Sequence, residues 1–388
     1  MVAFEEGFML SPLSRRRFLS HSGSILGGSM LGGAFSNVGS ADRRPGDYII
    51  VEGHRDIWEL SDRFRLPDES QHSPVRDFLV PRLIDAGVSI VIMPAGGDSL
   101  EERDGRDNMF EGSMRVLDML LCEIQKTGGR ASIIRTKADL PERPNAGKVQ
   151  FFLDLEGGGS IQIDPEPGYH PDRRLALLRQ FFRLGVRGMQ LTHNGRNMLA
   201  DGVGGGKMGG RLSDFGVEVI REMNRLGMMI GVSHLSANGI LHAAEVTKQP
   251  IVSTHQNIQP FLKTPLELTE PEVKAIASTG GIIGLRYIEE VTPYELLVDE
   301  VESLARSVGV EHIGIGWLGH DKGHPAVGHV PGYTKGEFSG VEAQSMYEHW
   351  DSLIRMLRKR GFTEEQIGLV LGGNFIRIWK QILPAAGE

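Results

Sequence analysis

The chain has 388 residues, of which 40% are hydrophobic and 24% are charged, a composition that is ordinary for a soluble globular protein. The formal net charge is -8 and no stripe of lysine or arginine is present, which argues against a nucleic-acid partner. Cys122 is the only cysteine, so an intrachain disulfide and a cysteine-ligated zinc site are both excluded. The length allows two domains, although one α/β barrel can use most of it.

The first 41 residues have the pattern of an export signal. Arg15, Arg16 and Arg17 form a twin-arginine motif, an apolar stretch runs from Ile25 to Phe35, and small residues follow at 39–41. This order is typical of export signals, and the apolar stretch is too short and too rich in glycine to remain as a membrane anchor. We therefore expect export to the periplasm or the extracellular space. The alternative is an exposed basic leader without an export role.

Residues 42–388 alternate short apolar runs with amphipathic stretches. Eight runs have the continuous apolar character of buried parallel strands. They lie at residues 48–51, 88–93, 149–155, 186–192, 228–233, 250–254, 281–285 and 312–318. One helical stretch, from Ser213 to Met223, begins with residues suited to an N-cap. Eight strand–helix units predict a single (β/α)8 barrel, the TIM-barrel fold, with a helical segment from Val341 to Leu383 packed outside it.

Side chains of metal-binding type occur at the ends of four of these runs. His54 and Asp56 follow the first run, Glu156 follows the third, and His234 and His255 follow the fifth and sixth. Functional groups of such barrels lie at the carboxyl ends of the strands, so these residues should meet there. Imidazole and carboxylate groups suit zinc, and Glu156 could bridge two ions roughly 3.5–4 Å apart. His54 and Asp56 would complete one side of this centre, and His234 and His255 the other. Any one of these histidines would more often be a hydrogen-bonded core or surface residue, so the interpretation depends on their shared position.

Several motifs follow one another in the order and spacing of the membrane (renal) dipeptidase family, which the chain resembles over nearly all of residues 42–388. They include Gly53-His54-Arg55-Asp56, Leu155-Glu156-Gly157-Gly158, Leu191-Thr192-His193-Asn194, Ser233-His234-Leu235-Ser236, Ser253-Thr254-His255 and Gly372-Gly373-Asn374-Phe375. The resemblance implies a zinc peptidase of the amidohydrolase type, in which the five residues above hold two ions and Glu156 is the bridge. It also implies that His193 polarises the scissile carbonyl, whereas the sequence alone equally allows a structural histidine there.

Leu318 departs from the family pattern at the end of the eighth run. It stands where the family has an aspartate that completes the metal shell and transfers protons, and a leucine can do neither. Asp321 is our candidate to replace that aspartate in catalysis, and His320 is the alternative. The departure predicts low activity on ordinary dipeptides and a second metal site that is weak or ligated by another group.

The chain departs from the family pattern at two further places, one that concerns recognition of the substrate and one in the fifth run. Leu266 stands where the family has an arginine that holds the carboxylate of the dipeptide, and a nearby lysine would not reproduce a bidentate guanidinium. The family's aspartate before the Ser-His pair of the fifth run is replaced in the segment 230–232.

The chain is thus expected to be a metal-dependent hydrolase that cleaves a peptide or amide-type bond with a metal-activated water. We expect zinc at two sites, His193 and Asp321 in catalysis, and a small-molecule partner such as a dipeptide or related amide. We expect neither nucleic acid nor a stable membrane anchor as a partner, and the sequence leaves homo-oligomerisation open. The departures keep two alternatives open, a weakly active or non-catalytic dipeptidase-like binding protein and a purely structural barrel without metal.

Overall fold

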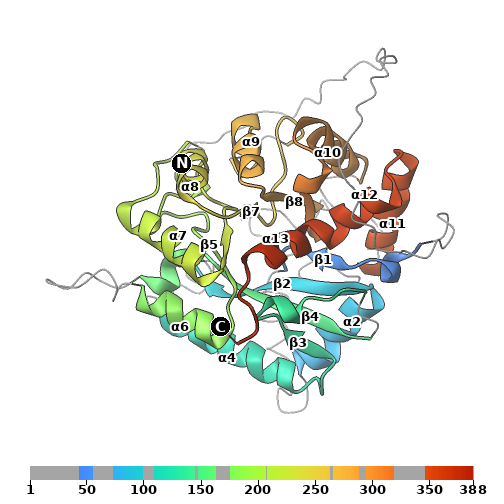
Figure 1. Cartoon of the computed structure of the whole chain (residues 1–388), viewed down its shortest axis with the longest axis horizontal. Helices are drawn as coiled ribbons and strands as arrows, with labels where there is room; N and C mark the ends of the chain where they lie inside the picture. The colour runs from blue at the N-terminus through green and yellow to red at the C-terminus, as the bar shows by residue number, and fades with distance from the viewer. Residues whose placement is uncertain are drawn as a thin grey trace, which may run out of the picture. The chain divides into compact units, whose positions relative to one another are not determined.

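The computed structural model describes residues 43–55, 73–98, 109–144, 147–162, 175–206, 208–262, 265–287, 294–318 and 346–387. Within these ranges eight parallel strands follow one another around a barrel, as the eight apolar runs predict (Figure 1). They are β1 (Ile50–Glu52), β2 (Val88–Gly97), β4 (Val149–Glu156), β5 (Gly188–Gln190), β6 (Met229–Gly231), β7 (Ile251–Ser253), β8 (Ile282–Tyr287) and β9 (Ile313–Leu318). The sequence pattern missed β3 (Ala131–Ile133), which pairs with β4 outside this order.

The segment after β1 joins the first strand to the last. The backbone N–H of Gly53 donates to the carbonyl oxygen of Ile315 at 2.9 Å, and the N–H of His54 donates to Gly316 at 2.7 Å. A Cβ atom on Gly53 would lie 2.8 Å from the ring of Phe375 and 3.0 Å from the backbone of Gly316, so this close approach requires glycine. The contact places His54 at the carboxyl end of the barrel, next to β9.

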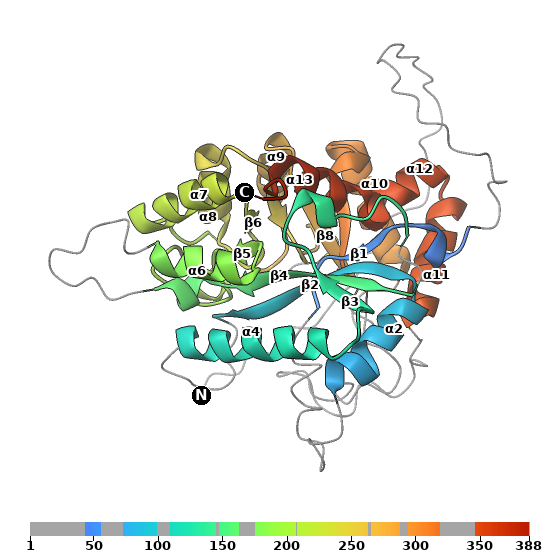
Figure 2. The same cartoon turned by 60° about the horizontal axis from the view of Figure 1, so that its bottom comes forward.

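Helices surround the strands in both views of the molecule (Figures 1 and 2). They are α2 (Val80–Asp85), α4 (Met109–Gln125), α6 (Ala176–Leu184), α7 (Asp214–Leu226), α8 (Ala237–Val246), α9 (Glu270–Ser278), α10 (Tyr294–Ser307), α11 (Met346–Lys359), α12 (Glu364–Gly368) and α13 (Asn374–Ile382). As predicted, α7 begins after an N-cap, because the Ser213 hydroxyl accepts the N–H of Gly216 at 3.0 Å. Among the described residues, no helix has the length and apolar character needed to cross a bilayer.

Alternating side chains of the strands form two apolar layers. The first, which we call the outer cluster, lies between strands and helices and contains strand residues such as Leu153, Ile283 and Leu285. The second, which we call the inner cluster, lies inside the barrel toward the amino ends of the strands. It contains residues such as Val51, Ile90, Phe152, Val252 and Ile282.

Helix α13 completes the inner cluster. Its Phe375 and Trp379 belong to that cluster, and the Trp379 ring stacks on Phe152 with centroids 4.4 Å apart. The expectation that the whole C-terminal segment packs outside the barrel therefore does not hold for α13. Because its apolar face buries against the strand starts, it closes the amino end and leaves the carboxyl end for polar groups.

Candidate metal centre

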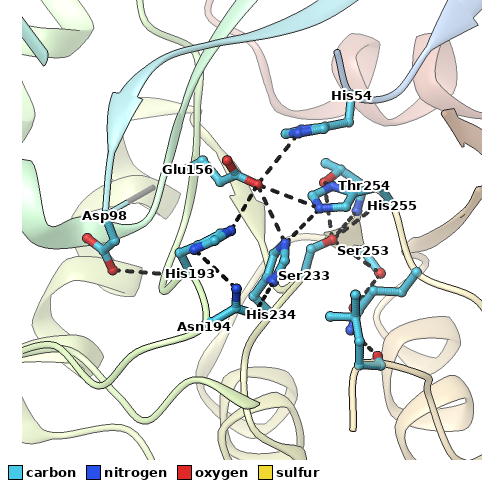
Figure 3. A network of polar contacts seen from close by, with 12 residues as sticks. His54, Asp98, Glu156, His193, Asn194, Ser233, His234, Ser253, Thr254 and His255 are labelled. Carbon is cyan, nitrogen blue, oxygen red and sulfur yellow. Dashed lines mark hydrogen bonds and ion pairs between the residues drawn. The ribbon is translucent and has the colours of Figure 1, made fainter. Parts of the chain in front are cut away.

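Four of the five predicted metal ligands lie together at the carboxyl end of the barrel (Figure 3). Glu156 is the last residue of β4, and His54, His234 and His255 follow β1, β6 and β7 by two or three residues. His193, predicted to act on the substrate, follows β5 by three residues and joins the same group. Asp56, Asp321 and His320 lie outside the described residues.

Glu156 is at the centre of this group. Its Oε1 atom lies 3.5 Å from Nε2 of His54, 3.5 Å from that of His234 and 3.6 Å from that of His255. The Nε2 atom of His193 is slightly farther away, at 4.0 Å. The Nε2 atoms of His234 and His255 are 2.8 Å apart, so the two imidazoles point at one place. Nitrogen and oxygen donors that converge in this way fit a divalent cation such as zinc.

The ligand atoms form two groups that share Glu156. One contains His54, Glu156 and His255, and the other contains Glu156, His193 and His234, with the ligand atoms of each group within 4.8 Å of one another. The sequence predicts His54 and Asp56 on one side of Glu156, and His234 and His255 on the other. The structure distributes the three histidines differently and adds His193 to the second group, but it retains Glu156 as the shared residue.

Burial sets the protonation state of these groups. It lowers the pKa of His234 to about 4 and holds the pKa of His255 well below its usual value, with the charge of His54 adding to the effect at His255. Burial alone would raise the pKa of Glu156, but the neighbouring imidazoles, led by His54, outweigh it and keep that pKa well below its usual value. Near pH 7, His234 and His255 are therefore neutral and Glu156 is ionised, which is the state that metal binding requires.

The other ring nitrogens have partners that orient the imidazoles. Nδ1 of His234 lies 2.9 Å from Oδ1 of Asn194, so this nitrogen donates and the lone pair of His234 is on Nε2, toward Glu156. The Thr254 hydroxyl lies 2.9 Å from Nδ1 of His255. Such outer partners fix the tautomer and orientation of metal-binding histidines. Asn194 belongs to a motif recognised in the sequence, but its contact with His234 was not predicted.

The sequence model of the membrane dipeptidase family, peptidase family M19, matches residues 45–387. The chain belongs to the membrane dipeptidase family. Dipeptidase verJ of Clonostachys rogersoniana is 25% identical over 289 residues, which are 72% of this chain and 67% of that protein. An uncharacterized dipeptidase of Schizosaccharomyces pombe is 29% identical over 248 residues, 61% of this chain, and this chain spans only 54% of that protein.

A solved structure shares the fold at low sequence identity. It is a metallopeptidase from Rhodobacter sphaeroides bound to a phosphinate mimic of the dipeptide L-Ala-D-Ala, with a TM-score of 0.67, 18% identity, and coverage of 87% of this chain and 99% of that one. Membership confirms the family and the (β/α)8 fold predicted from the sequence, and members of this dipeptidase family are metallopeptidases.

Asp98 supports the loop that carries His193, a role that the sequence analysis missed. It follows β2, and its carboxylate accepts the backbone N–H of Gly159, the backbone N–H of His193 at 3.3 Å and the Asn197 side-chain amide at 2.8 Å. Burial raises the pKa of Asp98 to about 6 despite these donors. In the sequence Asp98 stands five residues after the second apolar run, a weak signal from which no role was predicted.

Gly157 and His234 have backbone conformations with positive φ, at the loops that follow β4 and β6. Gly157 has φ 105°, and a Cβ atom there would lie 2.3 Å from the carboxyl carbon of Asp98, so no larger residue fits. His234 has φ 64°, which is uncommon for a residue with a side chain and costs of the order of 1 kcal/mol. Its carbonyl oxygen accepts the N–H of Val203 at 2.9 Å, which helps to hold this conformation.

Asp154 places a second carboxyl group inside the barrel, beneath Glu156. The two residues are two positions apart on β4 and share a face of the strand, and Asp154 is completely buried. Burial raises its pKa to about 7, so this group stays largely protonated in mildly acidic solution. In the sequence, the signal for this group is an acidic residue two positions before Glu156 within an apolar run.

Leu318 lies in a different place from the one that the sequence predicts. A register shift between β8 and β9 follows Leu285, so that one residue of β9 is passed over. The pairs around it are Leu285 with Ile315, Arg286 with Trp317, and Tyr287 with Leu318. Leu318 is 1% exposed and, like Tyr287, belongs to the outer cluster. Its side chain therefore packs with the residues between strands and helices, away from the metal ligands.

Leu266 and Gly231 stand at the other two departures from the family pattern. The carbonyl oxygen of Leu266 accepts the side-chain amide of Gln256 at 2.6 Å, which ties its loop to the residue after His255. Gly231 faces Gln190 of the neighbouring strand, where a Cβ atom would lie 2.6 Å from Cγ of Gln190. Gln190 thus fills the space in which a larger residue of β6 would otherwise lie.

Glu300 of α10 should make stability depend on pH. Burial raises its pKa to about 7 from 4.5, although it accepts the Asn257 amide at 2.6 Å and the Ile258 N–H at 3.2 Å. The folded state binds the proton of Glu300 more tightly than the unfolded state does. The contribution of Glu300 to the free energy of unfolding is therefore largest below pH 4.5, and it falls as the pH rises to 7. A shift of this size corresponds to about 3 kcal/mol in the free energy of unfolding.

Glu300→Gln removes this titration. We expect the stability of wild type relative to the variant to fall by about 3 kcal/mol between pH 4.5 and pH 8, as measured by urea unfolding. The control is Glu295→Gln, an exposed carboxylate on the same helix. The prediction would be contradicted if the free energies of unfolding of wild type and Glu300→Gln, plotted against pH, stayed parallel over this range.

Proposed function

We propose that this member of the dipeptidase family hydrolyses a peptide or related amide bond with zinc held at the Glu156 centre. The observation that carries the proposal is the convergence of the Nε2 atoms of His54, His234 and His255 on Oε1 of Glu156 at 3.5 to 3.6 Å. In the proposal, His54, Glu156, His234 and His255 hold the metal together with Asp56. Bound zinc supplies a water of lowered pKa and polarises the substrate carbonyl.

His193 is the residue that we propose to contact the scissile carbonyl. Its side chain is 15% exposed, compared with 4% for His54, 9% for His234 and 7% for His255, so it is the most accessible of the four. The Asn194 amide nitrogen lies 3.4 Å from Nδ1 of His193. Since that nitrogen can only donate, Nδ1 accepts and the proton of a neutral His193 is on Nε2, ready to be donated to a carbonyl oxygen. Asp321 remains our candidate to accept the proton of the attacking water.

A panel of dipeptides, simple amides and lactones tests this function. We expect the zinc-loaded protein to hydrolyse peptide or amide members of the panel, a chelator to stop the reaction and added zinc to restore it. The second candidate is a weakly active or non-catalytic binding protein, which Leu318 favours because it replaces the family's aspartate. Zinc-loaded, folded protein that turns over no member of the panel would support that candidate and contradict the first.

We infer that residues 1–41 direct the protein out of the cytoplasm through the twin-arginine route. The inference rests on Arg15, Arg16 and Arg17 followed by an apolar stretch, and these residues lie outside the described structure. Changing all three arginines to lysine should keep the protein in the cytoplasm, because lysine does not reproduce a guanidinium. Cell fractionation measures the result, and unchanged export of the triple variant would refute the assignment.

A further inference from the structure

A loop at the carboxyl end of the barrel begins directly after His255. This loop, residues 257–268, connects β7 to α9. Its backbone closes its base, because the N–H of Leu268 donates to the carbonyl oxygen of Asn257 and the N–H of Gln259 donates to that of Leu268, both at 2.9 Å. Gln259 and Pro260, farther from the base, are exposed. Loops that follow the strands of such a barrel border its functional site, so this loop lies on the side of the metal ligands.

The side chain of Gln256 connects this loop to the interior of the barrel. Its amide nitrogen donates to the carbonyl oxygen of Leu266 at 2.6 Å, and its Oε1 atom accepts the hydroxyl of Ser253 at 2.7 Å. The side chains of Gln256 and Ser253 are both completely buried. The amide therefore has one end on the loop and the other on the last residue of β7.

Buried hydroxyl groups continue from Ser253 to His255 (Figure 3). The hydroxyl oxygen of Ser233 lies 3.4 Å from that of Ser253 and 3.1 Å from that of Thr254. The Thr254 oxygen in turn lies 2.9 Å from Nδ1 of His255. Consecutive polar contacts thus lead from the loop to a residue that we predict to hold metal.

Ser233 is the point at which the two ends of this connection meet. Its oxygen accepts the backbone N–H of Thr254 at 2.8 Å and that of His255 at 3.2 Å, which uses both of its acceptor positions. Its one hydrogen is left for two acceptors, Thr254 toward the metal ligand and Ser253 toward the loop. A displacement at either end therefore changes the hydrogen bond at the other end.

We propose that Ser253 and Gln256 are positioning residues that couple zinc binding at His255 to the order of the loop 257–268. The proposal rests on the zinc centre of the proposed function and adds a regulation to it. Such coupling is reciprocal: if an ordered loop raises the affinity for zinc, zinc orders the loop by the same factor. The structural alternative is that the two side chains only fill the barrel and fasten the loop.

Two variants break the connection at different points. Gln256→Met removes both hydrogen bonds of the amide at similar volume, and Ser253→Ala removes the hydroxyl but leaves the contact of the amide with the loop. The control is Gln249→Met, just before β7. The Gln249 amide donates to the carbonyl oxygens of Met223 and Met228, both at 3.2 Å, so the control also removes hydrogen bonds to the backbone, at the other end of the same strand.

Two measurements test the coupling. Competition with a chelator gives the zinc affinity, and mass spectrometry gives the amide hydrogen exchange of residues 257–268 with and without zinc. We expect zinc to slow this exchange about fivefold or more in wild type and less than about twofold in Gln256→Met and Ser253→Ala. Zinc affinity should fall about tenfold in each variant. The double variant should lose no more than the larger single loss, because both changes break one connection.

Gln249→Met should match wild type in both measurements. The structural alternative predicts unchanged zinc affinity in Gln256→Met and Ser253→Ala, and this result would overturn the proposal. So would additive losses in the double variant. Exchange of the loop that zinc does not slow in wild type would also overturn it, and that comparison needs no variant.

Hydrolysis of the dipeptide and amide panel separates this proposal from the proposed function. Coupled zinc binding and loop exchange in a protein that hydrolyses no member of the panel would retain the coupling and refute catalysis. Hydrolysis that requires zinc, together with loop exchange that zinc leaves unchanged, would retain the proposed function and refute the coupling.

Discussion

Glu156→Gln should abolish hydrolysis and remove most of the metal from at least one of the two groups of ligands. Glutamine keeps the shape of the side chain and loses the negative charge. Oε1 of Glu156 is the atom that both groups share, so the change affects each of them. Loss of an outer hydrogen-bond partner of a metal ligand already costs roughly 10–100-fold, and we expect the loss of this shared ligand to exceed that range in kcat/KM.

Elemental analysis of the purified variant measures the metal, and dipeptide hydrolysis at saturating zinc measures the activity. The matched control is Glu111→Gln, which removes an exposed carboxylate that pairs with Arg115 on α4. This control should keep both metal and activity. Zinc content per chain in Glu156→Gln equal to that of wild type would contradict the assignment of the centre.

Leu318→Asp should destabilise the protein rather than activate it. The sequence alone predicts a gain in activity, because the change restores the family's aspartate. In the structure Leu318 is 1% exposed and packs in the outer cluster, so the new carboxylate would replace apolar contacts there. The loss of a buried leucine and the burial of an unpaired carboxyl group together cost about 4 kcal/mol or more.

Urea unfolding of wild type, Leu318→Asp and Leu318→Met measures this cost. Methionine has a similar volume and no charge, so this control should lose less than about 1.5 kcal/mol. The deficit of Leu318→Asp should shrink at low pH, where the carboxyl group is protonated and easier to bury. A stable Leu318→Asp variant with raised dipeptide turnover would show instead that residue 318 reaches the metals, as the sequence pattern suggests.

The barrel was predictable because its strands are continuous apolar runs. All eight runs became strands in the expected order, since a strand buried on both faces leaves that signal in sequence. The short strand β3 was missed because it has three residues and is only partly buried. The apolar character of α13 was visible, but its place inside the amino end depends on contacts such as Phe152 with Trp379, which join residues far apart in sequence.

The candidate site was predictable to the extent that its residues follow strands. His54, Glu156, His234 and His255 were found because strand ends of a parallel barrel meet. The orientation of Leu318 was not predictable, because it depends on a register shift between β8 and β9 that no local sequence pattern shows.

The central claim is that Glu156 and its histidines form a metal centre, and an anomalous difference map tests it most directly. Crystals of zinc-loaded protein would be measured on both sides of the zinc absorption edge. We predict strong peaks about 2.0–2.2 Å from Glu156 oxygens and from the Nε2 atoms of His54, His234 and His255. The number of peaks would show whether one or two ions bind. A map of zinc-loaded crystals without an anomalous peak beside Glu156 would contradict the account.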